Sequence, residues 1–305
     1  MKIVVIGAGA MGALFGGILA EQGNDVILLD VWPEHVSAIN ANGLVIESEG
    51  NRLQVSIEAT TDFDTVRQAD LAVVFVKSAH TREVARTVAD LIGTTGIALT
   101  LQNGMGNADI LAETLGGERV LAGTTSHGAT LLAPGVIRHA GVGATTIGLW
   151  QGAGSHRAQA VADLLNGAGI ETTITADVRA LVWEKLMINV GINAITALTG
   201  IKNGKIAEFP AARRLSQMAV EEAQSVAQSQ GVSVREDAVE HVLQVARATA
   251  ANRSSMGQDV DNRRQTEIGA INGAVVKYAQ QEGLKVPVNE ALTYLVETLQ
   301  AHYDG

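Results

Sequence analysis

The sequence contains no cysteine, and this absence removes several kinds of site. Without thiols the chain has no disulfides, no thiolate nucleophile and no thiolate ligands for a metal ion. The seven histidines are scattered along the sequence without the spacing of metal ligands, so we expect no metal site. The missing cysteines are also compatible with a reducing compartment.

A positive charge excess and a long apolar segment are missing as well. The chain has 22 Lys and Arg residues against 32 Asp and Glu residues, and its net charge of −10 argues against a nucleic-acid-binding surface. No uninterrupted apolar run approaches the length of a membrane span, and a predicted strand begins without the charged segment of a signal peptide. We expect a soluble cytoplasmic protein that binds neither nucleic acid nor membrane.

The first thirty residues predict a strand, a glycine turn, a helix and a second strand. Met1–Ile6 is an apolar run rich in β-branched residues, and Gly7, Gly9 and Gly12 follow it in G-x-G-x-x-G spacing before the helical run Ala13–Gln22. In such a turn the glycines allow a tight bend, a close approach to pyrophosphate and close packing of helix on strand. The pattern predicts a dinucleotide site at the start of this helix, with a glycine-rich turn of another α/β protein as the alternative.

An acidic residue supports the dinucleotide site and indicates its cofactor. Asp30 ends the second predicted strand 18 residues after Gly12, close to the position of the acid that binds the adenine ribose of NAD. A carboxylate there accepts hydrogen bonds from the ribose hydroxyls and repels the 2′-phosphate of NADP, and residues 31–34 contain no Lys or Arg. We therefore expect NADH to be favoured over NADPH.

Two further predicted strands end at polar residues. The buried run Leu71–Val76 is followed by Lys77, and the strand Ile97–Leu101 is followed by a polar turn that contains Asn103. Because ligands of open α/β sheets bind beyond the carboxyl ends of the strands, Lys77 and Asn103 are candidate ligand-binding residues.

The element pattern changes near Thr175. Before it, predicted strands and helices alternate, and after it only helical periodicity remains. We therefore predict an α/β, Rossmann-type dinucleotide-binding domain over residues 1–175 and an all-α C-terminal domain over residues 176–305. The expected helices of the second domain are Val178–Leu198, Ala211–Gln230, Val234–Ala251, Met256–Ala279 and Glu290–Ala301.

The first helix of the C-terminal domain carries a polar stripe. Lys185, Asn189 and Asn193 are spaced at i, i+4 and i+8, so they cover roughly 80° of an otherwise apolar helix. A solvated stripe on a surface helix is the simpler interpretation. However, asparagine is a poor helix former, and two of them in an apolar helix are better explained if their amides bind something.

A second polar cluster lies further along the chain. Asp259, Arg263 and Glu267 could form a ladder of ion pairs on an exposed helix face, and Ser254 or Ser255 could cap that helix. By themselves these residues do not require a ligand.

Together, these segments resemble the ketopantoate reductase family (2-dehydropantoate 2-reductases) over essentially the whole chain. The matching segments are GAGAMG at Gly7–Gly12, VKS at Val76–Ser78, QNGMGN at Gln102–Asn107, WEKLMINVGIN at Trp183–Asn193, SSMGQD at Ser254–Asp259 and TEIGAING at Thr266–Gly273. The resemblance implies an enzyme of pantothenate biosynthesis, in which hydride from a nicotinamide cofactor reduces the small 2-keto acid ketopantoate to D-pantoate.

The resemblance also implies a role for individual residues. Lys185 would protonate the carbonyl oxygen as hydride arrives, while Glu267 would accept from the substrate hydroxyl and help to orient Lys185. Asn189 and Asn193 would hold the hydroxyl and carbonyl end of the substrate, and Ser255 its carboxylate. Asn103 would bind both the substrate and the cofactor, near the nicotinamide. The residues implied in cofactor binding are Gly7, Gly9, Ala10, Met11, Gly12, Asp30, Lys77, Asn103 and Glu267.

One segment departs from the family pattern. Many family members resemble NADPH enzymes with a basic residue after the second strand, where this chain has Asp30 and Val31. The segment Leu28–Leu44 looks like that of NAD-dependent D-2-hydroxyacid dehydrogenases, so reduction of other branched or aromatic 2-keto acids is the alternative function. A non-catalytic dinucleotide sensor is a third, against which Lys185 and Glu267 argue. Pairing through an apolar face of the helical domain would give a homodimer.

Overall fold

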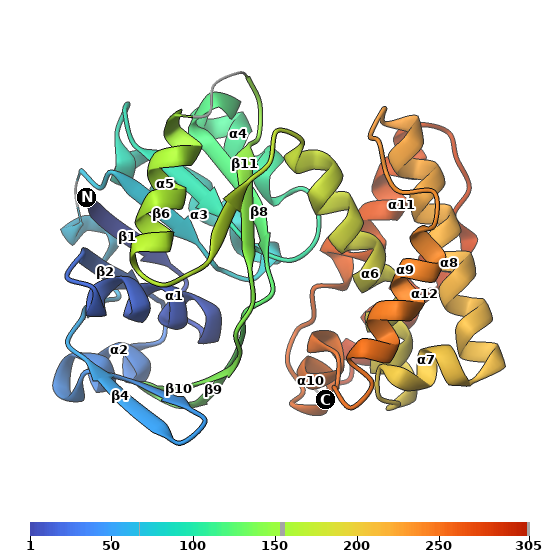
Figure 1. Ribbon diagram of the computed structural model, residues 1–305, viewed down its shortest axis with the longest axis horizontal. Coiled ribbons are helices and arrows are strands. Elements are labelled where there is room, and N and C mark those ends of the chain that lie inside the picture. Colours follow the sequence, from blue (N-terminus) through green and yellow to red (C-terminus); the bar gives the residue numbers. More distant parts are fainter. Residues whose placement is uncertain (67, 153–155, 304–305) are drawn as a thin grey trace. The chain divides into compact units, whose positions relative to one another are not determined.

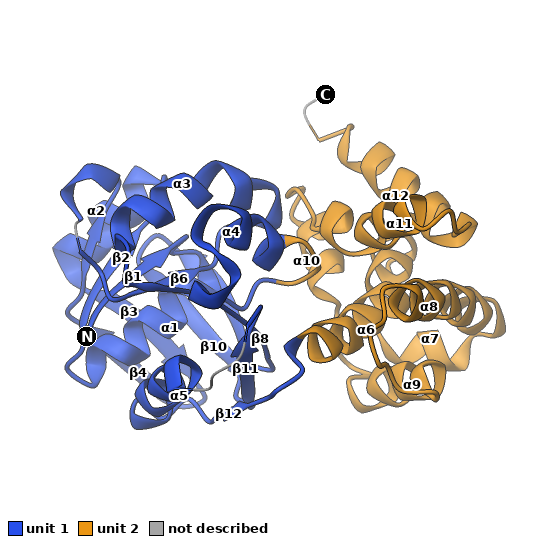
Figure 2. Cartoon of the chain, turned by 90° about the horizontal axis from the view of Figure 1, so that it is seen from above, with its two compact units in different colours: residues 1–102, 107–178 blue, residues 103–106, 179–305 orange. Residues whose placement is uncertain are grey.

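The chain, described by a computed structural model over residues 1–66, 68–152 and 156–303, forms two compact units. Unit 1 comprises Met1–Gln102 and Asn107–Val178, and unit 2 comprises Asn103–Gly106 and Arg179–Gly305 (Figure 2). The division after Val178 lies a few residues beyond Thr175, where the sequence pattern changes. The short segment Asn103–Gly106, which interrupts unit 1 in the sequence, belongs to unit 2. Residues 304 and 305 of the predicted helical domain lie outside the described residues.

Unit 1 is built on an eight-stranded sheet with the strand order β12-β11-β8-β7-β6-β1-β2-β5 (Figure 1). Neighbouring strands are parallel except for the antiparallel pair β8 and β11. The strands are β1 (Lys2–Ile6), β2 (Asp25–Leu29), β5 (Glu58–Thr60), β6 (Leu71–Val74), β7 (Ile97–Thr100), β8 (Val120–Thr125), β11 (Thr145–Leu149) and β12 (Thr172–Ile174). β1 lies between β2 and β6, and the strand order reverses there, as at the ligand-binding point of dinucleotide-binding folds.

Apolar strands and closely packed helices form the core of unit 1. The side chains of Ile3–Ile6 on β1 are fully buried, as expected for a strand covered on both faces. A Cβ at Gly16 of the first helix would lie 2.5 Å from Leu28 of β2, so glycine permits the close approach of helix and strand. The helices of unit 1 are α1 (Ala10–Glu21), α2 (Pro33–Asn42), α3 (Thr81–Ile92), α4 (Asn107–Leu115) and α5 (His156–Gly167).

A smaller sheet is made by two hairpins of unit 1. Its strand order is β4-β3-β10-β9, with β10 parallel to β3 and the two hairpin pairs antiparallel. The strands are β3 (Leu44–Ser48), β4 (Asn51–Val55), β9 (Gly128–Ala133) and β10 (Val136–Gly141).

The regular structure described in unit 2 is entirely helical, as the loss of strand signals after Thr175 predicts. The prediction of an α/β domain followed by an all-α domain is thereby confirmed. The helices of this part of the chain are α6 (Val178–Thr199), α7 (Gly204–Glu208), α8 (Pro210–Ser229), α9 (Ala238–Ala248), α10 (Ser255–Asp261), α11 (Asn272–Gln281) and α12 (Pro287–Gln300). α6 is long and apolar enough to cross a membrane, but 61% of its most apolar window is buried within the protein, as in the core helix of a globular fold.

The predicted single helix Met256–Ala279 is wrong. α10 ends at Asp261, and Arg263 has a positive φ of 51°, a conformation that ends a helix. A short 3-10 turn over Ile268–Ala270 precedes α11. No continuous helix therefore carries Asp259, Arg263 and Glu267, which rules out the predicted ladder of helical ion pairs and leaves Glu267 in the connection between two helices.

Candidate functional site

The glycine turn between β1 and α1 is shaped by backbone contacts. Gly7 has a φ of +90°, and a Cβ there would lie 2.6 Å from the backbone nitrogen of Val76. A Cβ at Gly12 would lie 1.9 Å from the carbonyl oxygen of Gly7, so any side chain would displace the turn. Gly9 differs, because a Cβ there would meet no atom within 4 Å. The fold therefore requires glycine at positions 7 and 12, while position 9 borders open space.

The first amides of α1 point out of the helix. The first hydrogen bond within the helix runs from the nitrogen of Ala13 to the oxygen of Gly9, at 2.8 Å. The N–H groups of Ala10, Met11 and Gly12 consequently have no acceptor one turn earlier in the helix. Such a set of donors at a helix start suits the oxygens of a pyrophosphate, so the local geometry fits a dinucleotide.

The end of β2 fixes the acidic residue expected at the ribose. Asp30 is half-buried, and its Oδ1 accepts a hydrogen bond from the backbone nitrogen of Trp32 at 3.0 Å. The Trp32 ring stacks on His35, with ring centres 5.3 Å apart and an angle of 8° between the planes. His35 is buried, its Nδ1 accepts from Gly135 at 3.0 Å, and burial lowers its pKa. The loop that carries Asp30 is thus held by the Trp32–His35 stack and, through His35, by the backbone at Gly135.

A hydrogen-bonded network follows the carboxyl ends of β6 and β7. Gln102 Nε2 donates to Thr81 Oγ1 at 2.9 Å, and Thr81 Oγ1 donates to Asn107 Oδ1 at 2.8 Å. Asn107 Nδ2 in turn donates to Ser78 Oγ at 3.2 Å. The network fixes the segment that begins with the exposed Lys77, at the edge of the sheet where ligands bind.

The residues of this network have no role among the predictions made from the sequence. Thr81 and Asn107 are the first residues of α3 and α4, and both are buried. Buried polar side chains at helix starts are usually hydrogen-bonded, and Gln102 and Asn107 stand at the two ends of the segment QNGMGN. That signal identifies candidate members of a network but not their partners.

In unit 2, Lys185 lies on α6 in an environment that disfavours its charge. Burial lowers the pKa of Lys185 to about 8, against a smaller opposing effect of the nearby Glu267 carboxylate. The residue as a whole keeps some exposed surface, so the effect reflects the surroundings of its ammonium group. An amine with a pKa near neutrality can exchange protons with a reacting group, which suits general acid catalysis.

Asn103 lies beside Glu267 because its chain segment is fixed to unit 2. The nitrogen of Met105 donates to the oxygen of Ala270 at 2.8 Å. Gly104 has a φ of +83°, and a Cβ there would lie 2.3 Å from the same oxygen. Asn103 Nδ2 donates to Glu267 Oε2 at 3.2 Å. The structure thus brings together an amide, a carboxylate and the candidate acid Lys185.

The remaining polar candidates lie further along α6 and on α10. Asn193 is buried and donates from Nδ2 to Ser255 Oγ at 3.5 Å. The Nδ2 atom of Asn189 is buried without a hydrogen-bond partner among the described residues, which is costly unless a ligand accepts from it. Ser254 caps α10 by accepting from Gly257 N at 3.0 Å, so the cap does not occupy Ser255.

Comparisons with known proteins match both units. The sequence model of the family described as "Ketopantoate reductase PanE/ApbA" matches residues 3–152, and that of "Ketopantoate reductase PanE/ApbA C terminal" matches residues 177–300. A 2-dehydropantoate 2-reductase of Halobacterium salinarum is 44% identical over 301 residues, which are 98% of this chain and 99% of that protein. One from Pyrococcus abyssi is 36% identical and covers 99% of this chain and 98% of its own.

Solved structures agree over the full length. A PanE/ApbA family ketopantoate reductase from Ralstonia eutropha superimposes with a TM-score of 0.91 at 32% identity, covering 100% of both chains. A D-mandelate dehydrogenase in a ternary structure with NADH and anilino(oxo)acetate has a TM-score of 0.93 at 27% identity, also covering 100% of both chains. The same fold therefore occurs in dehydrogenases and reductases that are named for different substrates.

Proposed function

The chain belongs to the ketopantoate reductase family, and we propose that it reduces 2-dehydropantoate to D-pantoate with hydride from a nicotinamide cofactor. The observation that carries the proposal is the environment of Lys185 in unit 2, where burial lowers the pKa to about 8 beside Glu267. The proposal is supported by an amine able to give up a proton beside a carboxylate that accepts from Asn103 Nδ2. Such a set is suited to the reduction of a carbonyl group.

Lys185 acts as the general acid in this proposal. When bound, the cofactor supplies the hydride that is added to the carbonyl carbon of the substrate. The ammonium of Lys185 donates its proton to the carbonyl oxygen, where negative charge develops, and becomes a neutral amine. Its lowered pKa favours this transfer, and uptake of a proton from solvent restores the starting state.

Glu267 and Asn103 position the acid and the ligands. The Glu267 carboxylate favours the charged form of Lys185, so it opposes part of the effect of burial. Its Oε2 also accepts from Asn103 Nδ2, which fixes the carboxylate, and we propose that Glu267 accepts from the substrate hydroxyl.

Two amides and a hydroxyl hold the substrate. We assign the unpartnered Nδ2 of Asn189 to an oxygen of the substrate, because binding would satisfy a buried donor. Asn193 and Ser255 are hydrogen-bonded to each other, and we assign them to the carbonyl end and the carboxylate, respectively.

The cofactor side of the proposal rests on unit 1. The glycine turn fits a pyrophosphate, as do the amides of Ala10 and Met11, which have no acceptor one turn earlier in α1, and Asp30 fits the adenine ribose. We propose that NADH is favoured over NADPH, because the Asp30 carboxylate would repel a 2′-phosphate and residues 31–34 offer no cation to bind it. We further assign Lys77 to the nicotinamide end.

A second function is favoured by one specific observation. The fold is shared with a D-mandelate dehydrogenase solved with NADH, and Asp30, just after β2, is an acidic residue of the kind that suits NADH. An NAD-dependent D-2-hydroxyacid dehydrogenase acting on branched or aromatic 2-keto acids is therefore the alternative. A sensor without catalysis would have no need of a lysine with a lowered pKa. A cytoplasmic location and a homodimer are predictions that cell fractionation and light scattering would test.

The two enzymatic functions differ in the substrate hydroxyl. The experiment that tests the proposal is a measurement of kcat/KM for three substrates. These are ketopantoate, 2-ketoisovalerate, which lacks the hydroxyl, and phenylglyoxylate, which is aromatic. A site built to bind the hydroxyl should favour ketopantoate over 2-ketoisovalerate by about 10⁴-fold, since the analogue leaves polar groups unpaired. Equal values would overturn the proposal, and a preference for phenylglyoxylate would establish the alternative.

A further inference from the structure

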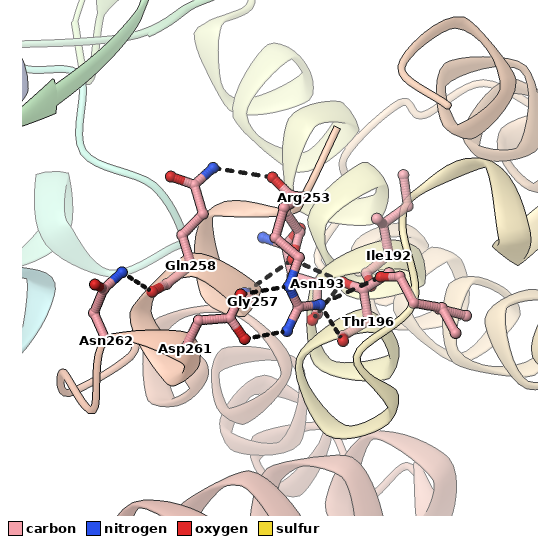
Figure 3. A network of polar contacts seen from close by, with 10 residues as sticks. Ile192, Asn193, Thr196, Arg253, Gly257, Gln258, Asp261 and Asn262 are labelled. Carbon is pink, nitrogen blue, oxygen red and sulfur yellow. Dashed lines mark hydrogen bonds and ion pairs between the residues drawn. The ribbon is translucent and has the colours of Figure 1, made fainter. Parts of the chain in front are cut away.

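One arginine joins the helix that carries Asn193 to the helix that carries Ser255. Arg253 donates from Nε and Nη2 to the two carboxylate oxygens of Asp261, at 2.8 Å each (Figure 3). Its Nη1 donates to the carbonyl oxygens of Thr196 in the last turn of α6 and of Ile201 just after it. Only 18% of the Arg253 side chain is exposed. These four bonds use the planar fork of a guanidinium, which lysine lacks.

The arginine crosses α10 at a glycine. A Cβ at Gly257 would lie 2.6 Å from the Cζ atom of Arg253, so the guanidinium occupies the space of a missing side chain (Figure 3). Asp261, the acceptor of the pair, is the last residue of α10. A helix of seven residues is not stable by itself in water, so its position depends on such tertiary contacts.

The two residues that follow Arg253 also contact α6. Thr196 Oγ1 donates to Ser254 Oγ at 2.7 Å, and Asn193 Nδ2 donates to Ser255 Oγ at 3.5 Å. Residues 253, 254 and 255 therefore each contact the last turns of α6. The contact of Ser255 is the longest of them, at 3.5 Å, and is therefore the weakest hydrogen bond. The position of the Ser255 hydroxyl consequently depends mainly on the backbone that carries it.

We propose that the Arg253–Asp261 pair is a positioning device for the substrate, which holds Ser255 at the distance from Asn193 that the 2-keto acid requires. The inference rests on the proposed function, because it uses the assignment of Asn193 and Ser255 to the substrate. Arg253 itself is a positioning residue, because its guanidinium donates to Asp261 and to backbone oxygens of Thr196 and Ile201 and not to a group assigned to a ligand. A mere surface ion pair would contribute little to stability or binding.

Arg253→Lys keeps the charge and removes the fork. We expect KM for ketopantoate to rise about tenfold, with a smaller change in kcat and an unchanged KM for NADH, because small displacements of binding groups weaken productive binding. Asp261→Asn removes the charge of the acceptor with little change in shape, and it should also raise KM for ketopantoate.

A double-mutant cycle separates positioning from general destabilisation. If Arg253 acts through Ser255, Arg253→Lys should raise KM about tenfold in the wild-type background and by less than twofold in the Ser255→Ala background. Thermal unfolding of all variants shows whether Tm falls together with the rise in KM for ketopantoate. If Arg253→Lys fails to fold, the same cycle with Asp261→Asn in place of Arg253→Lys tests whether the pair acts through Ser255.

The pair Arg235–Asp237 offers a matched control. It is also bidentate, with bonds of 2.6 and 3.0 Å, but it joins residues two apart and lies outside the proposed substrate site. Arg235→Lys should leave KM for ketopantoate within twofold.

An unchanged KM for ketopantoate in Arg253→Lys and Asp261→Asn, or an equal rise of this KM in the wild-type and Ser255→Ala backgrounds, overturns the inference while leaving the proposed function intact. A wild-type enzyme inactive on 2-keto acids overturns the proposed function first, and the inference with it.

Discussion

The candidate cofactor site of unit 1 and the candidate substrate site of unit 2 are constructed in different ways. In unit 1, the amides at the start of α1 come from one short stretch of chain, and glycines at positions 7 and 12 are required by backbone contacts within 3 Å, to Val76 and to Gly7 respectively. In unit 2, the candidate groups come from four separate segments, and some are joined by side-chain hydrogen bonds such as Asn103–Glu267. The candidate cofactor site is defined by the shape of the backbone. The candidate substrate site is a set of side chains, among which Lys185 has a lowered pKa.

The difference determines how each site should respond to mutation. A backbone site fails when a side chain is added, because atoms then overlap. A side-chain site fails when a group is removed, because a proton donor or a hydrogen bond is lost. Substitutions of both kinds therefore test the comparison between the two sites.

Lys185→Ala should have the largest effect on catalysis. Loss of the general acid should lower kcat about 10³-fold while KM for NADH stays within twofold, because the change lies in the side-chain site alone. Steady-state kinetics at saturating NADH measure both quantities. Lys202→Ala, at an exposed lysine of the same unit, is the control and should leave kcat unchanged. Retention of full activity by Lys185→Ala would remove this residue from the mechanism.

Alanine at two glycines should separate shape from ligand contact in unit 1. Gly12→Ala places a Cβ 1.9 Å from the Gly7 oxygen, so it should destabilise the fold by about 1–3 kcal/mol and weaken NADH binding as well. Gly9→Ala meets no protein atom within 4 Å, so Tm should not change, yet KM for NADH should rise roughly tenfold because the methyl group would occupy the space next to the pyrophosphate. Denaturant titrations and NADH kinetics provide the two readouts. Normal NADH binding by Gly9→Ala would show that this glycine does not face the cofactor.

The double change Asp30→Ala with Val31→Arg should alter the preference between cofactors. Removing the carboxylate and adding a guanidinium should shift the ratio of kcat/KM for NADH and NADPH about tenfold toward NADPH. Val31→Ala is the control, since Val31 is 80% exposed and its truncation changes no charge. An unchanged ratio in the double variant would mean that Asp30 does not bind the ribose.

The pH dependence of the rate gives the smallest effect. Reduction requires the protonated Lys185, so kcat/KM for the keto acid should be at its maximum well below pH 8, fall to half near the pKa of about 8, and decrease further above it. Oxidation of the hydroxy acid requires the neutral amine, so its rate should rise with pH through the same range. Both profiles can be recorded in one buffer series. A reduction rate that increases between pH 7 and 9 would contradict the assignment of the acid.

The elements that the sequence predicts best have strong local patterns. The helix predicted over Val178–Leu198 begins at Val178 in the structure and ends one residue later than predicted, at Thr199. The region after Met256 was predicted as one helix, because its apolar periodicity continues past the positive φ of Arg263. Periodicity records which side chains are apolar, but a break between α10 and α11 depends on backbone conformation and tertiary contacts.

The candidate site shows the same limit. The spacing of Lys185, Asn189 and Asn193 is enough to place them on one face of a helix. It does not say which serine caps α10, and Ser254 takes that role because its Oγ accepts from both Thr196 and Gly257. The choice leaves Ser255 to contact Asn193.

The sequence by itself determined the glycine turn of unit 1, the two fold classes in order and the polar stripe of α6, because each depends on residues close together in the chain. Only the tertiary structure decided that Asn103 meets Glu267, 164 residues later, and that burial lowers the pKa of Lys185 to about 8. Hydrogen bonds across such separations, and the loss of water around a charge, arise only when distant segments pack together. A residue's type can therefore be read from the chain, whereas its chemistry depends on the neighbours that folding provides.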